Sequence, residues 1–99
     1  MVTIVTIEIR AKKGLGNELM SIFKQFTPIA RNTEGNLSIH LLQDQDDPDL
    51  LMFYQRWESR EHQEKYLAQF RERGNYEIID PFLDSKPVMH YFDDATPGD

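Results

Sequence analysis

Histidine and tyrosine are the side chains of this sequence best suited to handling a proton near neutral pH. His62, Tyr66 and Phe70 are spaced i, i+4, i+8, which places them on one face of a helix. A neutral imidazole at His62 can accept a proton, and the phenol of Tyr66 can donate a hydrogen bond to an oxyanion. The same spacing is typical of an amphipathic helix that packs aromatic residues into a core, so both interpretations stay open.

The chain lacks the residues that several other kinds of chemistry require. The chain has no cysteine, which excludes disulfides, thiolate zinc sites, iron–sulfur clusters and a cysteine nucleophile. It also lacks a glycine-rich dinucleotide or phosphate loop and a serine nucleophile elbow. We expect no metal site, because His40, His62 and His90 would have to converge from two strands and a helix. The acidic segment 44–49 lacks the spacing of a calcium loop and is predicted to be a solvated turn.

Length and charge limit the class of protein. The chain has 99 residues, enough for one small domain, with 11 basic and 17 acidic residues and a net charge of −6. Such an acidic balance argues against a nucleic-acid partner and against binding to an anionic membrane. We see no secretory signal and no apolar run long enough to span a membrane. The expectation is a cytoplasmic protein.

The pattern of hydrophobic residues predicts the strands that position these side chains. Runs rich in β-branched and apolar residues predict strands over 2–10, 37–43, 50–57 and 87–92. On the first strand, Val5, Ile7 and Ile9 share one face, while Ile4 lies on the other.

Helical periodicity fills the gaps between the strands. A helix is predicted to open at Asn17 or a neighbour, with a kink or restart at Thr27 because Pro28 lacks a backbone donor. Ser59 is the expected cap of a second helix. A short third helix follows Gly74, broken at residues 80–81.

The resulting order predicts an α+β fold of the ferredoxin-like split βαβ type (βαββαβ), with one antiparallel sheet and helices on one face. Residues 1–93 are expected to form a single domain and residues 94–99 a frayed tail. Helices on one face leave the other bare, yet that side is expected to carry Ile4, Leu42, part of the segment 50–54 and part of the segment 88–92. An exposed apolar sheet predicts a homodimer that closes face to face with an identical sheet.

Several short motifs resemble one protein family. They are Gly14, the segment TEGNLSIHLLQD (33–44) and the segment YQRWES (54–59), which precedes a helix. Over residues 2–92 the sequence is similar to the antibiotic biosynthesis monooxygenase (ABM) family, most of all to its small quinol-monooxygenase-like members. The resemblance implies a dimeric α/β barrel with a pocket between each sheet and its own helices. Characterised relatives oxidise aromatic polyols or quinols there with molecular oxygen, without metal or flavin, whereas other branches degrade haem or process small signalling metabolites.

The resemblance carries over residue by residue. Trp57 matches the tryptophan that ends the third strand in many members. Tyr66 and Phe70 stand where quinol-oxidising relatives frequently have histidines, which leaves His62 as the nearest histidine. Ile7, Tyr66 and Tyr76 replace the asparagine, tryptophan and axial histidine of the haem-degrading branch, so haem degradation is disfavoured.

The combined expectation is a cofactor-independent monooxygenase that oxidises a small phenolic or quinol-like substrate with O2. The alternatives are a non-catalytic dimeric binder of a small aromatic ligand and a small-metabolite isomerase that uses the same pocket. The expected catalytic residues are His62, Tyr66 and Trp57. The alternative role is packing in the core or interface for Trp57, packing in the core for Tyr66, and a half-exposed place near the helix cap for His62. The residues expected to bind substrate are Ile7, Phe53, Phe70 and Tyr76.

Overall fold

One antiparallel sheet forms the base of the molecule. The computed structural model describes residues 2–98. The strands are β1 (Thr3–Arg10), β2 (Asn36–Gln43), β3 (Leu50–Trp57) and β4 (Val88–Asp93). Their spatial order is β2-β3-β1-β4, with every neighbouring pair antiparallel. This arrangement confirms the predicted α+β, ferredoxin-like fold.

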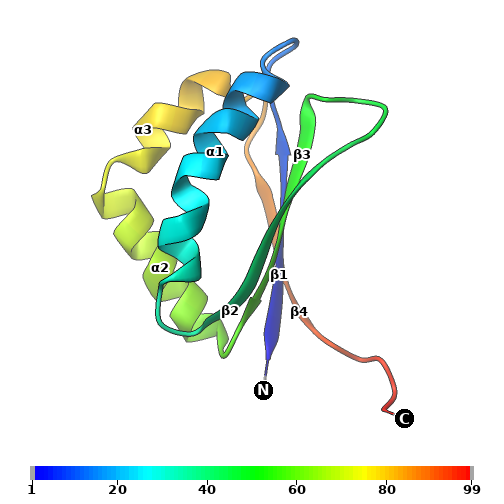
Figure 1. Cartoon of the computed structure of the whole chain (residues 1–99), viewed down its shortest axis with the longest axis vertical. Helices are drawn as coiled ribbons and strands as arrows, with labels where there is room; N and C mark the ends of the chain where they lie inside the picture. Colours follow the sequence, from blue (N-terminus) through cyan, green and yellow to red (C-terminus); the bar gives the residue numbers. More distant parts are fainter. Residues whose placement is uncertain (1, 99) are drawn as a thin grey trace.

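All helices lie on the same side of this sheet (Figure 1). They are α1 (Gly16–Arg31), α2 (Arg60–Glu72), α3 (Asn75–Ile79) and a 3₁₀ turn, η1 (Asp80–Phe82). The restart expected near Thr27 was wrong, because α1 continues without a break to Arg31. Pro28 falls in the last turn of α1 and removes one helical hydrogen bond, the one that a backbone N–H there would donate to the carbonyl of Lys24.

The start of α1 is held by a residue distant in the sequence. The helix begins at Gly16, and Leu15 provides no side-chain cap. The carboxylate of Asp49, in the β2–β3 connection, instead accepts hydrogen bonds of 2.9 Å from the backbone N–H groups of Gly14 and Gly16. A carboxylate at this position satisfies free donors and complements the positive end of the helix dipole.

Alternation along the strands separates a covered and an open face. Val5, Ile9, Leu51 and Phe53 point toward the helices and are buried. Their neighbours along the strands point the other way, where no helix lies (Figure 1). This open face carries apolar side chains from all four strands, as predicted: Ile4, Leu42, Leu50, Met52, Tyr54, Val88 and Phe92.

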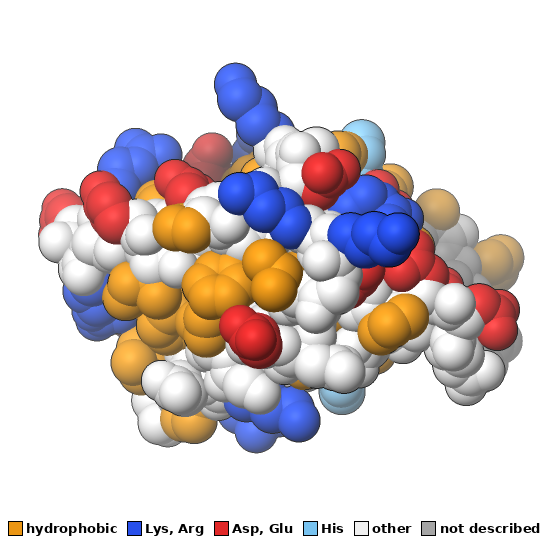
Figure 2. Space-filling model, turned by 90° about the horizontal axis from the view of Figure 1, so that it is seen from above, with side chains coloured by type: hydrophobic (Ala, Val, Ile, Leu, Met, Phe, Trp, Pro, Cys, Tyr) orange, Lys and Arg blue, Asp and Glu red, His pale blue; other side chains and the backbone are white. Residues whose placement is uncertain are grey.

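Exposed apolar side chains are not confined to the open face. Figure 2 shows one end of the molecule, where hydrophobic side chains gather between acidic and basic ones. Ile29 of α1 and Ile78 of α3 are also exposed, at 44% and 49%. Exposure of single apolar residues therefore does not by itself distinguish the open face from the helical side.

None of the helices within residues 2–98 is long and apolar enough to cross a membrane. Residues 94–98 of the predicted tail have no regular secondary structure, and Asp99 lies outside the described residues.

The junction between α1 and the β2–β3 connection leaves no room for a side chain at Gly16. A Cβ placed there would lie 2.0 Å from the backbone oxygen of Pro48. We predict that Gly16→Ala lowers the free energy of unfolding by about 1–3 kcal/mol, because backbone must move to relieve the overlap. Urea denaturation measures the change. Gly98→Ala is the matched control, since nothing lies within 4 Å of that position; equal stability of the two variants would contradict the prediction.

Candidate functional site

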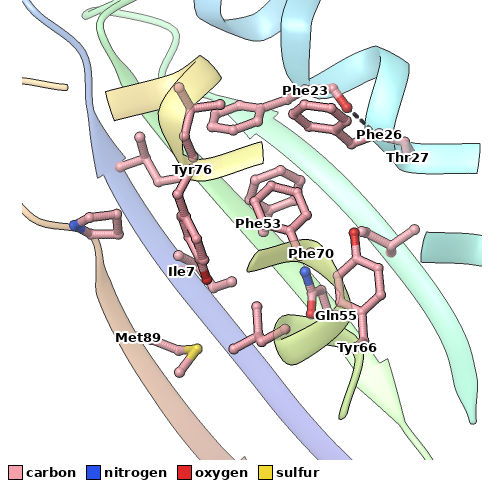
Figure 3. Close-up of a pocket in the computed structure, with 15 residues that line it drawn as sticks. Ile7, Phe23, Phe26, Thr27, Phe53, Gln55, Tyr66, Phe70, Tyr76 and Met89 are labelled. Atoms are coloured by element: carbon pink, nitrogen blue, oxygen red, sulfur yellow. Dashed lines mark hydrogen bonds between the residues drawn. The ribbon is translucent and has the colours of Figure 1, made fainter. Parts of the chain in front are cut away.

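A cavity of about 260 Å³ lies between the covered face of the sheet and the helices (Figure 3). Its floor comes from β1, β2 and β3, its walls from α1, α2 and α3, and one side from the beginning of β4. Fifteen residues line it: Ile7, Ile9, Phe23, Phe26, Thr27, Ile39, Phe53, Gln55, Tyr66, Leu67, Phe70, Tyr76, Ile79, Pro87 and Met89. A dry apolar cavity of roughly 150 Å³ holds benzene, so this one is large enough for an aromatic molecule of about two rings.

Aromatic rings from different helices contact one another around the cavity. Phe70 of α2 packs edge-to-face with Phe26 of α1 at 5.2 Å between ring centroids, and with Tyr76 of α3 at 5.1 Å. Phe23 meets Phe53 from the sheet at 4.9 Å. These edge-to-face pairs are a favourable geometry for aromatic rings. They fix the walls in place and present flat apolar surfaces to the interior.

Few polar groups reach this cavity. Of the residues that line it, only Thr27, Gln55, Tyr66 and Tyr76 carry a nitrogen or oxygen atom in the side chain. The hydroxyl of Thr27 donates to the backbone oxygen of Phe23 at 3.0 Å and is therefore already used within α1. Within residues 2–98, no histidine, lysine, arginine or carboxylate lines the cavity. Its chemistry must therefore be carried by two phenols and one amide.

Burial keeps these phenols protonated. Desolvation raises the pKa of Tyr66 to about 12, from an ordinary value of 10.0. The pKa of Tyr76 is raised as well, chiefly by burial. Both groups are thus neutral hydrogen-bond donors at physiological pH, and neither is available as a base.

The amide of Gln55 is held by the indole of Trp57. The Nε1–H group of Trp57 donates to Oε1 of Gln55 at 2.9 Å, and the two side chains are only 0% and 3% exposed. The Trp57 ring also packs against the ring of Tyr66, with 5.5 Å between centroids. Trp57 therefore lies behind the cavity wall and supports two of its polar residues.

His62 is separated from the cavity. It lies in the first turn of α2, where its Nδ1 is 2.7 Å from Oγ of Ser59. Its ring packs against Gly35, where a Cβ would lie 2.3 Å from the imidazole. Ser59 also accepts a hydrogen bond from the backbone N–H of His62, so the predicted cap of α2 is present. The imidazole faces a polar surface hollow between the end of α1 and α2.

The structure thus brings together five of the seven residues expected to form the site. Ile7, Phe53, Tyr66, Phe70 and Tyr76 all line the cavity. Trp57 and His62 do not line it, so their expected catalytic roles stay predictions. The histidines are also not brought together: within residues 2–98, no three histidine or carboxylate side chains are placed to hold a metal ion.

Gln55 is the functional candidate that the sequence analysis missed. The covered-face positions of β3 read Leu51, Phe53, Gln55 and Trp57, so one polar residue interrupts an otherwise apolar series. That interruption was a usable signal, because a buried polar side chain demands a partner. Phe23 and Phe26 of α1 also line the cavity, and they are not among the residues expected to bind a substrate.

The sequence and the fold of this chain are similar to those of known proteins. Residues 2–73 match the sequence model of the family "Antibiotic biosynthesis monooxygenase". No curated protein matches the chain at a significant level. Solved structures with the same fold include a protein from Nitrosomonas europaea, with a TM-score of 0.86 and 11% identity over 97% of this chain and 92% of that one. A conserved protein from Methanosarcina mazei has a TM-score of 0.83 and 14% identity over 93% of this chain and 91% of that one.

A third solved structure is SnoaB of Streptomyces nogalater, described as a cofactor-independent oxygenase. It aligns with a TM-score of 0.82 and 14% identity over 97% of this chain and 95% of that chain. At such identities the structural matches show a shared fold, whereas the family model covers well over half of the sequence. The chain belongs to the antibiotic biosynthesis monooxygenase family.

Proposed function

We propose that the protein is a cofactor-independent monooxygenase that oxidises a small phenolic or quinol-like substrate with O2 inside the cavity. The observation that carries the proposal is the cavity itself, whose aromatic walls enclose about 260 Å³ with only four polar residues. Membership of the family and the description of SnoaB as a cofactor-independent oxygenase support the same reaction class.

The reaction needs an electron-rich substrate and a site that excludes water. An ionised phenol or quinol can give an electron to O2, after which the two radicals combine at the activated ring carbon. In a quinol, one ring C–H becomes C–OH and the two phenolic C–OH groups become C=O. One oxygen atom of O2 stays in the product, and the other leaves as water with the two phenolic hydrogens. The substrate supplies all four electrons. Exclusion of water protects such intermediates, and the apolar lining of this partly open cavity limits the access of water to them.

Tyr66 is the proposed donor to the substrate oxygen. It is 5% exposed, lines the cavity and stays protonated because burial raises its pKa. A fixed donor stabilises negative charge on an oxygen more in a dry site than in water. Its phenol therefore favours the ionised substrate.

Oxygen consumption with a panel of hydroquinones tests the proposal, measured with an oxygen electrode in the presence of a chelator. We predict uptake by the wild type and a decrease of about 100-fold in kcat/KM for Tyr66→Phe, the size of effect seen when one oxyanion donor is removed. His62→Ala is the comparison variant: it should retain turnover, because His62 is not part of the cavity wall.

A binding protein without catalysis is the second candidate, and one observation favours it. No residue that lines the cavity is a base near neutral pH, whereas proton removal from a substrate commonly uses one. Quenching of Trp57 fluorescence by hydroquinones without any oxygen consumption would support the binder and contradict the oxygenase.

The titration of Tyr66 gives an independent check of the site. The folded protein holds this proton up to about pH 12, whereas the unfolded chain loses it near pH 10. The unfolded state therefore binds fewer protons between these values, and the free energy of unfolding should fall as the pH rises from about 10 to about 12. Phenolate absorbance should show one tyrosine ionising near pH 12 that Tyr66→Phe lacks and Tyr54→Phe, on the open face, retains. If both variants kept the transition near pH 12, the assignment of that transition to Tyr66 would be contradicted.

We further propose that the open face pairs with the same face of a second copy. Leu42 and Val88, on opposite edge strands, are 46% and 48% exposed, with apolar side chains on the central strands between them. Association buries such surface, and a two-fold axis lets one patch complement itself.

A pair of matched substitutions tests this homodimer. Phe92 on the open face and Ile78 on α3 are 48% and 49% exposed. We predict that Phe92→Glu converts a dimer to a monomer in light scattering at micromolar concentration, because a carboxylate would be buried in the interface. Ile78→Glu should remain dimeric. A monomeric wild type, or dissociation by Ile78→Glu alone, would contradict the proposed interface.

A further inference from the structure

Gln55 brings an amide donor to the cavity. It is 3% exposed on the covered face of β3, between Phe53 and Trp57, and it lines the cavity. Its Oε1 is satisfied by Trp57, but Nε2 donates no hydrogen bond to any of residues 2–98. This nitrogen is not fully buried, since among the described residues Ser38 Oγ is the fully buried side-chain atom without a partner; Nε2 is therefore accessible to a molecule in the cavity. In Figure 3 the amide projects from the sheet into the space enclosed by the aromatic rings.

The orientation of this amide is determined by chemistry. The indole Nε1–H can only donate, so the group that faces it must be the amide oxygen. The amide nitrogen is therefore directed away from Trp57. Trp57 is fully buried and packs against Tyr66, which helps to hold the indole in this position.

We propose that Gln55 binds the oxygen of an aromatic ligand through Nε2, and that Trp57 is the positioning residue that keeps this donor facing the cavity. The ligand oxygen must be an acceptor: the phenolate of an ionised phenol or quinol, or the carbonyl of a quinone. This inference rests on the proposed function only in placing an aromatic ligand in the cavity. It adds which atom of the ligand is recognised and by which atom of the protein.

An anionic ligand would depend on hydrogen-bond donors here, because burial disfavours a bare charge and no cation lines the cavity. A hydrogen bond to a charged oxygen is stronger than one to a neutral oxygen, and no carboxylate lines the cavity to repel it. A ring without an acceptor oxygen leaves Nε2 unpaired, which disfavours its binding. No lysine, arginine or histidine among the lining residues competes with the amide for the ligand's charge.

The probe for this proposal is 4-nitrophenol, whose phenol and phenolate forms differ in visible absorbance. Its negative charge is shared between the phenolic and nitro oxygens, so Nε2 stabilises the anion at either end. Titration of the bound probe gives its pKa on the protein without any turnover. We expect the wild type to bind the phenolate form, and Gln55→Met to raise the pKa of the bound probe by about 1–2 pH units, the equivalent of one hydrogen bond to a charged group.

Two further variants separate recognition from structural support. Gln55→Glu keeps an oxygen for Trp57 but removes the donor, so the pKa of the bound probe should rise at least as far as in Gln55→Met. If Gln55 only satisfied Trp57, Gln55→Met and Trp57→Phe would both leave the pKa of the bound probe at its wild-type value. Trp57→Phe keeps the amide but frees its orientation, and the pKa of the bound probe should lie between those of the wild type and Gln55→Met.

Thr27→Val is the matched control, since it removes a polar group from the same cavity whose hydrogen bond is already made within α1. It should leave the pKa of the bound probe unchanged. The proposal would be overturned if the wild type bound no probe, or if Gln55→Met titrated as the wild type does. Oxygen uptake with hydroquinones is measured separately, so either result is distinguishable from failure of the oxygenase proposal.

Discussion

The segment that carries α2, α3 and η1 is attached to the sheet at its two ends, and the cavity is the space left between them. At one end, Gln63 accepts a 2.6 Å hydrogen bond from the Tyr91 hydroxyl of β4, while Trp57 packs against Tyr66. At the other end, the backbone of Leu83 bridges to Ala11. Large aromatic side chains fill the space between the helices and the sheet around the cavity, and the cavity itself stays open. The functional site therefore follows from how this segment is anchored.

The hydrogen bonds at these anchors also explain how polar side chains are accommodated in such an apolar site. Gln63 is completely buried, yet it both accepts from Tyr91 and donates to the sulfur of Met89 at 3.6 Å. The side chain of Gln55, in contrast, only accepts a hydrogen bond from the described residues, and its nitrogen donates none to them. The two glutamines thus differ in a way that burial alone does not reveal. The first completes the fold, whereas the second leaves a donor for a molecule that enters the cavity.

The regular parts of the fold could be predicted from local patterns, and the site only in part. The alternation over β1 and β3 depends only on residues close together in the sequence, and so does the helical spacing of Tyr66 and Phe70. The elements predicted from these patterns were therefore correct. The cap supplied by Asp49 to α1 joins residues more than thirty positions apart, and no local pattern contains it. His62 shares a helical face with Tyr66 but lies one turn earlier, where its ring turns toward Ser59 and Gly35. Helical spacing gives the face of a residue but not how far along the helix the cavity extends.

The apolar lining constrains the chemistry as much as it permits it. The burial that encloses a small aromatic molecule also raises the pKa of Tyr66 to about 12, so this phenol cannot remove a proton at neutral pH. A histidine within the cavity would have supplied a base, but the nearest one in the helix is outside it. The protein can still favour the ionised form of a ligand by offering donors to its oxygen. The acidity of the ligand, rather than a base of the protein, then sets the fraction of molecules that bind in the reactive form.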